Sequence, residues 1–303
     1  FNIPEENLSK TENVTSLRFV IKGVGPYTSR ALLSQVKIFP DTLENCGIDQ
    51  TNEATFVQNI KEGQVAAECK YGGQEYVATT VLNQTGENHV VTEFKNKSDK
   101  PLSMRYYTSA HLYRNPAYCQ DAGVSKDGKT IYATRTTPTA SPDKLAWVSA
   151  ATIAATVEGG EWTNTGSTNS MAYGDFTIPA NGTVRVIAYV DGGEYDSTYT
   201  GYSEITAETS PTLERAIEKS QTGNSEEIFA DSSAWWKDYW QKSYVDIYDK
   251  TVEKYYYTAL YIVGGATRDQ NVPSSLFGPY ISSDSMSWGG TYVTDYNLYG
   301  TYM

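Results

Sequence analysis

Alternating apolar and polar positions dominate the chain from residue 16 to about residue 190. Short runs with a period near two are separated by Gly, Asn, Asp and Pro, which is the pattern of antiparallel strands joined by turns. The clearest runs are 16–23, 64–71, 75–83, 89–96 and 183–190. Because no helical period falls between them, the pattern predicts a β-sandwich rather than a parallel α/β sheet. The strand pattern is weakest over 115–129, where the sequence is mostly typical of a loop.

The period changes near residue 209. Ser210 is a good N-cap and Pro211 suits a first helical turn, so a short helix is predicted there. A second helix is predicted after Asn224, as in a capping box. One face of this second helix carries Trp235, Trp236, Tyr239 and Trp240. Their spacing is that of a buried helical stripe, and we expect the tryptophans to lie in a seam between domains.

A third helix is predicted from Asp249, its N-cap, to Gly264 and Gly265, where it can end. It is followed by a loop of about 27 residues, from 271 to 297, that is rich in Trp, Tyr, Asp and Gly. Long loops in a compact fold are usually functional or disordered. The aromatic content of this loop favours an ordered active-site loop.

Composition narrows the class of protein. Only 20% of the residues are charged and Tyr occurs 25 times, a balance common in extracellular β-rich and sugar-handling proteins. The net charge is −12 and no Lys/Arg-rich run is present, which argues against nucleic acid as a partner. No apolar run approaches the roughly 18 residues that a membrane span needs. The start at Phe1 fits a processed secreted protein or a trimmed chain.

Candidate catalytic and metal-binding chemistry is sparse. Cys46, Cys69 and Cys119 lack metal-ligand spacing, so no metal or other cofactor is predicted; one disulfide and three free thiols both remain open. His89 and His111 lie in strand-like contexts and are expected to be structural. The sequence contains no phosphate-binding glycine loop, GxSxG elbow or HExxH motif.

Three segments, taken in order, carry a family resemblance. They are WWKDYWQKSYVDIYD (235–249), KYYYTALYIVGGATR (254–268) and SWGGTYVTDYNLYGTYM (287–303). Together they resemble bacterial glycoside hydrolases of family 95, the α-L-fucosidase and α-L-galactosidase type, and the related family 65-like clan with an (α/α)6 barrel. The resemblance implies a mainly β fold, in which a large antiparallel β-super-sandwich is followed by linker helices and the first helices of a truncated barrel. The expected limits are 1–205, 206–248 and 249–303.

The resemblance also implies site residues. Asp295 and Asn297 match two amide positions of the family pattern, which position or polarise the group that activates the attacking water. Asp295 departs from the Asn of the fucosidase pattern, and it equally suits the N-cap of a next helix. Trp288 and Tyr292 would line the sugar subsite, and burial beneath the sandwich is the alternative for both.

The implied function is that of a secreted or periplasmic bacterial enzyme, an inverting exo-glycosidase that acts on oligo- or polysaccharides of plant or host origin. The resemblance places the catalytic acid and base in later barrel helices, so we expect this chain to be catalytically silent. Exposed barrel helices are expected to favour self-association. An inverting phosphorylase and a non-catalytic carbohydrate-binding or adhesion sandwich are the alternatives. A basic cluster would favour the phosphorylase, and the loop has only Arg268 at its edge.

Overall fold

Antiparallel strands make up most of the part of the chain that this computed structural model describes. The described residues are 53–71, 73–110, 119–136, 148–168, 170–195 and 210–267, together with Val293 and Tyr296. All of them belong to one compact unit, Leu43–Met303. A second unit, Phe1–Thr42, lies outside the described residues, and so does the strand predicted at 16–23.

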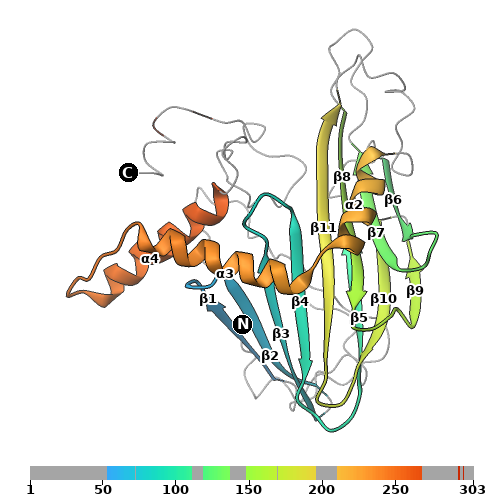
Figure 1. The fold of residues 1–303 in the computed structure, drawn as a ribbon, viewed down its shortest axis with the longest axis horizontal. Coiled ribbons are helices and arrows are strands. Elements are labelled where there is room, and N and C mark those ends of the chain that lie inside the picture. Colours follow the sequence, from blue (N-terminus) through green and yellow to red (C-terminus); the bar gives the residue numbers. More distant parts are fainter. Residues whose placement is uncertain are drawn as a thin grey trace, which may run out of the picture. The chain divides into compact units, whose positions relative to one another are not determined.

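Eight strands form the larger sheet, sheet A, in the order β1-β2-β3-β4-β11-β8-β7-β6 (Figure 1). They are β1 (Glu53–Asn59), β2 (Gln64–Tyr71), β3 (Gln74–Leu82), β4 (His89–Asn96), β6 (Cys119–Val124), β7 (Thr130–Thr136), β8 (Val148–Glu158) and β11 (Thr183–Tyr195). Every neighbouring pair is antiparallel, and β1 to β4 form a meander. The register places Ile187 of β11 opposite Val91 of β4 and Thr156 of β8.

Three strands form sheet B, in the order β5-β10-β9. They are β5 (Leu102–Ser109), β9 (Asn164–Ser167) and β10 (Met171–Ile178). Alternate residues of β10 are buried, as expected for a strand with one face on the core. The core between the two sheets includes Phe94 of sheet A and Phe176 of sheet B, whose ring centroids lie 5.3 Å apart. The prediction of a mainly antiparallel β-sandwich is therefore confirmed.

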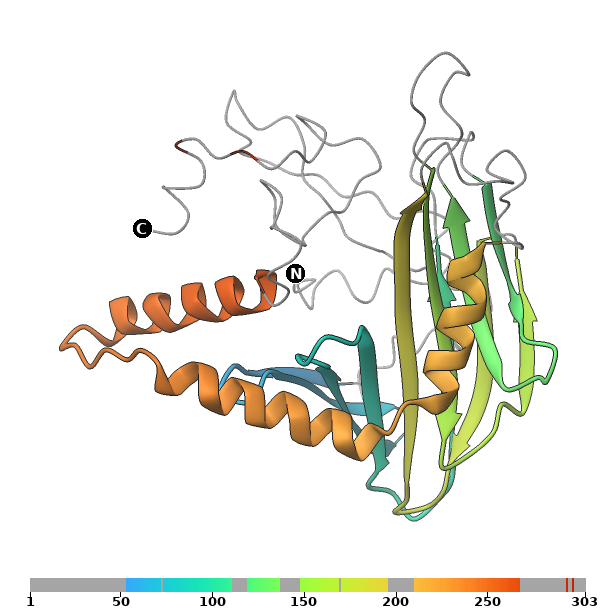
Figure 2. The ribbon, with the colours of Figure 1, turned by 45° about the horizontal axis from the view of Figure 1, so that its top comes forward.

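The helices begin at the N-caps that the sequence predicts. Ser210, Asn224 and Asp249 each accept backbone N–H hydrogen bonds at the starts of α2 (Pro211–Thr222), α3 (Ser225–Gln241) and α4 (Lys250–Ala266). Helices α2 and α3 lie on sheet A, and α4 folds back beside α3 to form a helical hairpin (Figure 2). The domain limits predicted at 205 and 248 stay predictions.

The face of sheet A that α2 and α3 cover has its own small apolar clusters. Ile228 of α3 packs on Val81, Val91 and Ile187, and Ala216 of α2 packs on Ala154 and Tyr189. These clusters are separate from the core between the sheets, so sheet A is buried on both faces where the helices lie.

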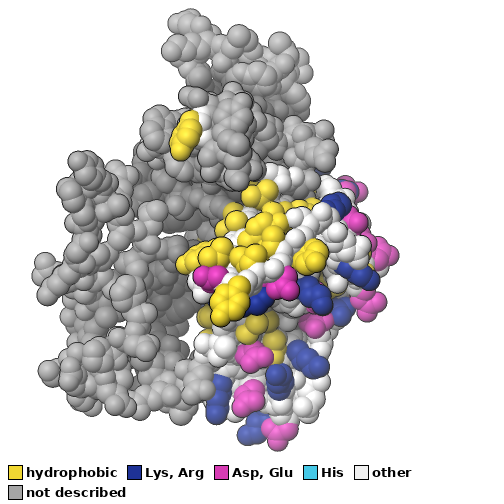
Figure 3. All heavy atoms as spheres, turned by 90° about the vertical axis from the view of Figure 1, so that its left-hand side faces the viewer, with side chains coloured by type: hydrophobic (Ala, Val, Ile, Leu, Met, Phe, Trp, Pro, Cys, Tyr) yellow, Lys and Arg dark blue, Asp and Glu magenta, His cyan; other side chains and the backbone are white. Residues whose placement is uncertain are grey.

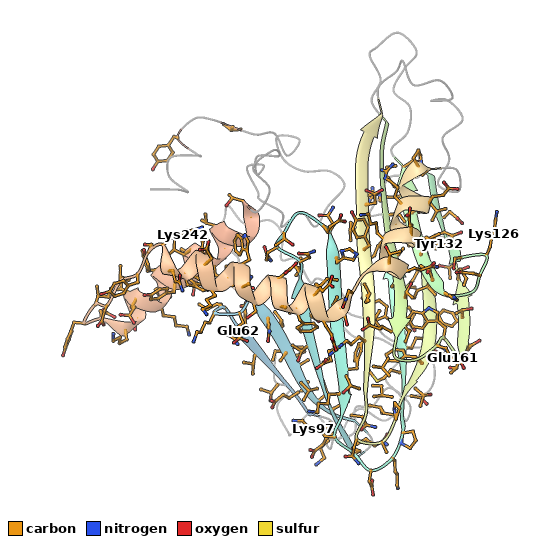
Figure 4. All side chains as sticks on the ribbon, in the orientation of Figure 1. Glu62, Lys97, Lys126, Tyr132, Glu161 and Lys242 are labelled. Carbon is orange, nitrogen blue, oxygen red and sulfur yellow. The ribbon has the colours of Figure 1, made fainter. Side chains whose placement is uncertain are left out.

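A chain of hydroxyl groups joins α2 to sheet A. Thr134, Thr152 and Thr212 form two successive hydrogen bonds of 2.7 and 2.8 Å between their Oγ1 atoms. A hydroxyl both donates and accepts, so this buried contact is satisfied without a charge. Tyr132 of β7, which lies beside α2 in Figure 4, donates its hydroxyl hydrogen to Asp121 at 3.1 Å.

Helix α4 does not end at its glycine pair, so this prediction from the sequence is wrong. Gly264 and Gly265 lie inside the helix, which continues to Ala266. Gly264 is buried, and a Cβ atom there would come within 2.9 Å of the ring of Tyr239 and 3.2 Å of the ring of Trp236. The glycine therefore permits close packing of α4 on α3 instead of terminating the helix.

Candidate functional site

The four site residues predicted from the sequence, Trp288, Tyr292, Asp295 and Asn297, lie outside the described residues, and their roles stay predictions. Within that segment the structure describes Val293, which is half-buried, and Tyr296, which is 79% exposed. The described region that precedes this segment in the chain is the α3–α4 hairpin, and its surroundings form the candidate site.

An aromatic cluster holds the two helices of the hairpin together. Trp236 is only 1% exposed, and it stacks on Tyr261 of α4 with ring centroids 4.7 Å apart. Trp240 stacks on the Trp236 ring at 5.8 Å, and Trp235 stacks on Tyr239 at 5.2 Å. The predicted stripe is thus fully buried at Trp236 and half-buried at Trp235 and Trp240.

The same cluster contacts the turn between β1 and β2, which Glu62 marks in Figure 4. Trp240 Nε1 donates a hydrogen bond of 3.0 Å to the carbonyl oxygen of Ile60. The Trp236 ring lies against Gly63, whose φ of +64° is in the left-handed region. Trp236 Nε1 is buried and finds no hydrogen-bond partner among the described residues. Residues far apart in the sequence therefore meet at this seam.

Tyrosine hydroxyls fix the connection between α3 and α4. Tyr239 Oη donates to the carbonyl oxygen of Leu260 at 2.8 Å. Tyr257 Oη donates to the Val245 carbonyl at 2.8 Å and accepts from the Val245 amide at 3.2 Å. These bonds satisfy backbone groups that the turn would otherwise leave unpaired.

Ion pairs fasten the start of α3 to sheet A. Arg185 of β11 lies 2.8 Å from Glu93 and 3.8 Å from Glu158, measured between side-chain nitrogen and oxygen atoms, and its Nη1 donates to Ser225 Oγ at 3.1 Å. The Ser225 hydroxyl also donates to Glu158. These contacts fasten the first turn of α3 to strands β4, β8 and β11 of sheet A.

His89 has the structural role that the sequence predicts, whereas His111 lies outside the described residues. The imidazole is buried, its Nε2 donates to the Lys219 carbonyl at 3.0 Å, and its ring packs edge-on against Tyr189. Nearby, Lys219 Nζ lies 2.8 Å from Glu87 Oε1, and this hydrogen bond holds the pKa of Glu87 below its ordinary value. These contacts hold the end of α2 against sheet A.

A pocket of about 300 Å³ opens where the hairpin meets the β1–β2 turn. Among the residues that the structure describes, Ile60, Lys61, Trp240, Tyr244 and Tyr257 line it. Three aromatic rings, one aliphatic side chain and one lysine can hold a flat apolar group that carries a negative charge. The sequence contained no signal for this pocket other than the tyrosines around the end of the second predicted helix.

Metal and thiol chemistry can be judged only for the described part of the chain. No group of three or more His, Cys, Asp or Glu side chains there is arranged to hold a metal ion. Cys69 is a half-buried free thiol, and Cys46 and the side chain of Cys119 lie outside the described residues. None of the described helices is long and apolar enough to cross a membrane.

Comparison with known proteins gives a likeness of fold. No family model and no curated protein matches the chain. A solved structure described as "Putative kojibiose phosphorylase from human microbiome" matches with a TM-score of 0.51 and 10% sequence identity. The match covers 75% of this chain and 31% of that one, so this chain spans about a third of the matched protein. The match shows a likeness of fold alone, over the sandwich and the helices that follow it.

Proposed function

We propose that this chain is the sandwich and first helical part of a carbohydrate-active enzyme that cleaves glycosidic bonds in oligo- or polysaccharides. The observation that carries the proposal is the order of parts: two packed sheets, two helices on the outer face of sheet A, and then an aromatic helical hairpin. A protein described as a kojibiose phosphorylase matches over three quarters of this chain. A secreted or periplasmic location, proposed from composition, fits a polysaccharide substrate.

The outer face of α4 supports the presence of further helices in the enzyme. Val252, Tyr255 and Ile262 are 53%, 72% and 43% exposed and lie along one side of α4. A soluble helix normally turns polar residues outward, as α3 does with Glu226, Glu227, Asp231 and Lys237. An apolar outer stripe is expected where another helix of an (α/α)6 barrel packs. If that helix is missing, the same stripe would favour self-association.

Two reactions are open to an enzyme of this fold. The first candidate, which follows the resemblance to family 95, is an inverting exo-glycosidase. In it Asp295 and Asn297 orient the attacking water, and a protonated carboxyl group lies on the opposite face of the sugar. The matched structure favours the second candidate, an inverting phosphorylase, in which inorganic phosphate takes the place of water. In both cases the general acid is proposed to lie in barrel helices beyond this chain, and Trp288 and Tyr292 are proposed to line the sugar subsite.

We expect the complete gene product, and not this chain alone, to be active. The product should be incubated with kojibiose and with aryl α-L-fucosides, with and without inorganic phosphate. Release of free sugar without phosphate would identify a hydrolase, whereas a sugar 1-phosphate formed only with phosphate would identify a phosphorylase. Turnover by the present chain alone would contradict the placement of the catalytic acid. Inactivity of the complete product on a broad glycan panel would count against the proposal.

Replacing Asn297 with alanine in the complete product is expected to lower kcat by about 10²–10³, the usual effect of losing one positioned hydrogen-bonding group at a reaction centre. KM should change much less, because the amide is proposed to act on the nucleophile rather than on the ground-state sugar. Lys126→Ala, at an exposed position in the β6–β7 turn, serves as the control. Near-normal kcat in Asn297→Ala would remove this residue from the mechanism.

A further inference from the structure

The turn that connects α3 to α4, residues 242–249, is unusually apolar for an exposed segment; we call it the hairpin end. Tyr248 is fully exposed, Tyr244 is 78% exposed and Ile247 is 37% exposed. Figure 3 shows hydrophobic side chains gathered on the face of the molecule that carries the helical hairpin. Exposed apolar patches of this kind usually mark interaction sites.

The 300 Å³ pocket opens at the same end, because Tyr244 contributes to both features. One water occupies about 30 Å³ of liquid, so the pocket has room for an aromatic ring. Trp240, Tyr244 and Tyr257 offer ring surfaces to such a guest. Lys61 lines the pocket and forms no ion pair with any other described residue, so it favours a guest that carries a negative charge.

The hairpin end itself presents a group with this chemistry. Tyr248 projects into solvent between Asp246 and Asp249 along the chain. The Asp246 side chain is 78% exposed, and its hydrogen bond from Lys250 lowers its pKa, which keeps the carboxylate charged. One surface thus carries both an aromatic ring beside carboxylates and an aromatic pocket beside a lysine.

We propose that two copies of this chain associate through their hairpin ends about a two-fold axis, with Tyr248 of each copy inserted into the pocket of the other. Lys61 then faces the carboxylate of Asp246 across the interface. A two-fold contact places the same patch on both partners. Because this patch carries both the projecting ring and the pocket, each copy can insert its ring into the pocket of the other. The opposite charges fix the register of the two copies. This inference is independent of the proposed enzymatic function.

The mass of the purified chain should be measured by sedimentation equilibrium from micromolar to sub-millimolar concentration. The wild-type chain is expected to approach twice the mass of one chain. Tyr248→Ser should weaken dimerisation by roughly tenfold or more, as the loss of a central aromatic anchor does. Phe56→Ser is the control, because Phe56 is 73% exposed on β1, outside both the hairpin end and the outer stripe of α4. Tyr255→Ser tests the stripe separately, because Tyr255 is 72% exposed there.

A charge exchange tests the pairing itself. Lys61→Glu should weaken the dimer because it would place two negative groups together, and adding Asp246→Lys should restore it. A wild-type chain that stays monomeric throughout would overturn the proposal. Dissociation by Tyr255→Ser and not by Tyr248→Ser would also overturn it, and would move the association to the α4 stripe. Enzymatic activity does not enter either experiment, so these results leave the proposed function untouched.

Discussion

Replacing Trp236 with alanine is expected to lower the free energy of unfolding by about 3–5 kcal/mol, the range for large aromatic residues in protein cores. Trp236 is the largest fully buried side chain of the described residues. Its ring contacts Trp235, Tyr239, Trp240 and Tyr261. Truncation would leave a cavity between α3, α4 and the β1–β2 turn, which the surrounding rings cannot fill without losing their stacking. Urea denaturation followed by tryptophan fluorescence and by circular dichroism would measure the loss.

Two further variants make this prediction specific. Trp236→Phe should cost less than Trp236→Ala, because it keeps an aromatic ring and removes the buried Nε1 hydrogen that lacks a partner among the described residues. Tyr255→Ala, at an exposed position of α4, should change stability by at most about 0.5 kcal/mol. A cost for Trp236→Ala as small as that of Tyr255→Ala would show that the helical hairpin does not depend on this cluster.

Gly63→Ala is expected to destabilise the protein by about 2–5 kcal/mol, the sum of two separate costs. The first cost is conformational, since Gly63 has a φ of +64°, where side chains other than glycine are strained. The second is steric, since a Cβ atom would meet the Nε1 atom of the buried Trp236 at 1.9 Å. The indole cannot move away without disturbing its stack on Trp240 and Tyr261. Equilibrium unfolding in urea would measure the combined cost.

Gly73→Ala separates these two costs. Gly73 has a φ of +78°, and a Cβ atom there would meet nothing within 4 Å. This variant should therefore show the conformational cost alone, about 1–2 kcal/mol. The excess cost of Gly63→Ala over Gly73→Ala measures how firmly Trp236 is held against the turn. Equal losses of stability in the two variants would mean that the indole of Trp236 moves away from the added Cβ atom at no measurable cost.

Local chemistry explains what could be predicted from the sequence. Helix starts depend on one capping side chain and its next few residues, so Ser210, Asn224 and Asp249 were identified correctly. Strands β2 (Gln64–Tyr71) and β4 (His89–Asn96) have the predicted limits, since each is a short strand-like run bounded by turn residues. The strand Cys119–Val124 was not predicted, because its segment is mostly typical of a loop. It lies at the edge of sheet A and buries only Ala122 among its described side chains, so its sequence needs little apolar alternation.

Non-local contacts explain what the sequence could not show. The role of Gly264 depends on two rings of α3, and a glycine near a helix end gives the same local signal whether it terminates the helix or permits packing. The pocket joins Ile60 to Trp240, which are 180 positions apart. No periodicity in either segment indicates that they meet. The predicted site residues at 288–297 lie outside the described residues and stay predictions.

The position of β11 beside β4 has a consequence for biosynthesis. Ile187 pairs with Val91, which left the ribosome 96 residues earlier. At typical elongation rates of about 5–20 residues per second, the meander β1–β4 waits roughly 5–20 seconds for the strand that completes its open side. Until then β4 presents unpaired backbone groups next to apolar side chains, the arrangement most prone to intermolecular pairing. The nascent meander therefore exposes a strand edge during this interval that does not exist in the finished fold, where β4 lies inside the sheet.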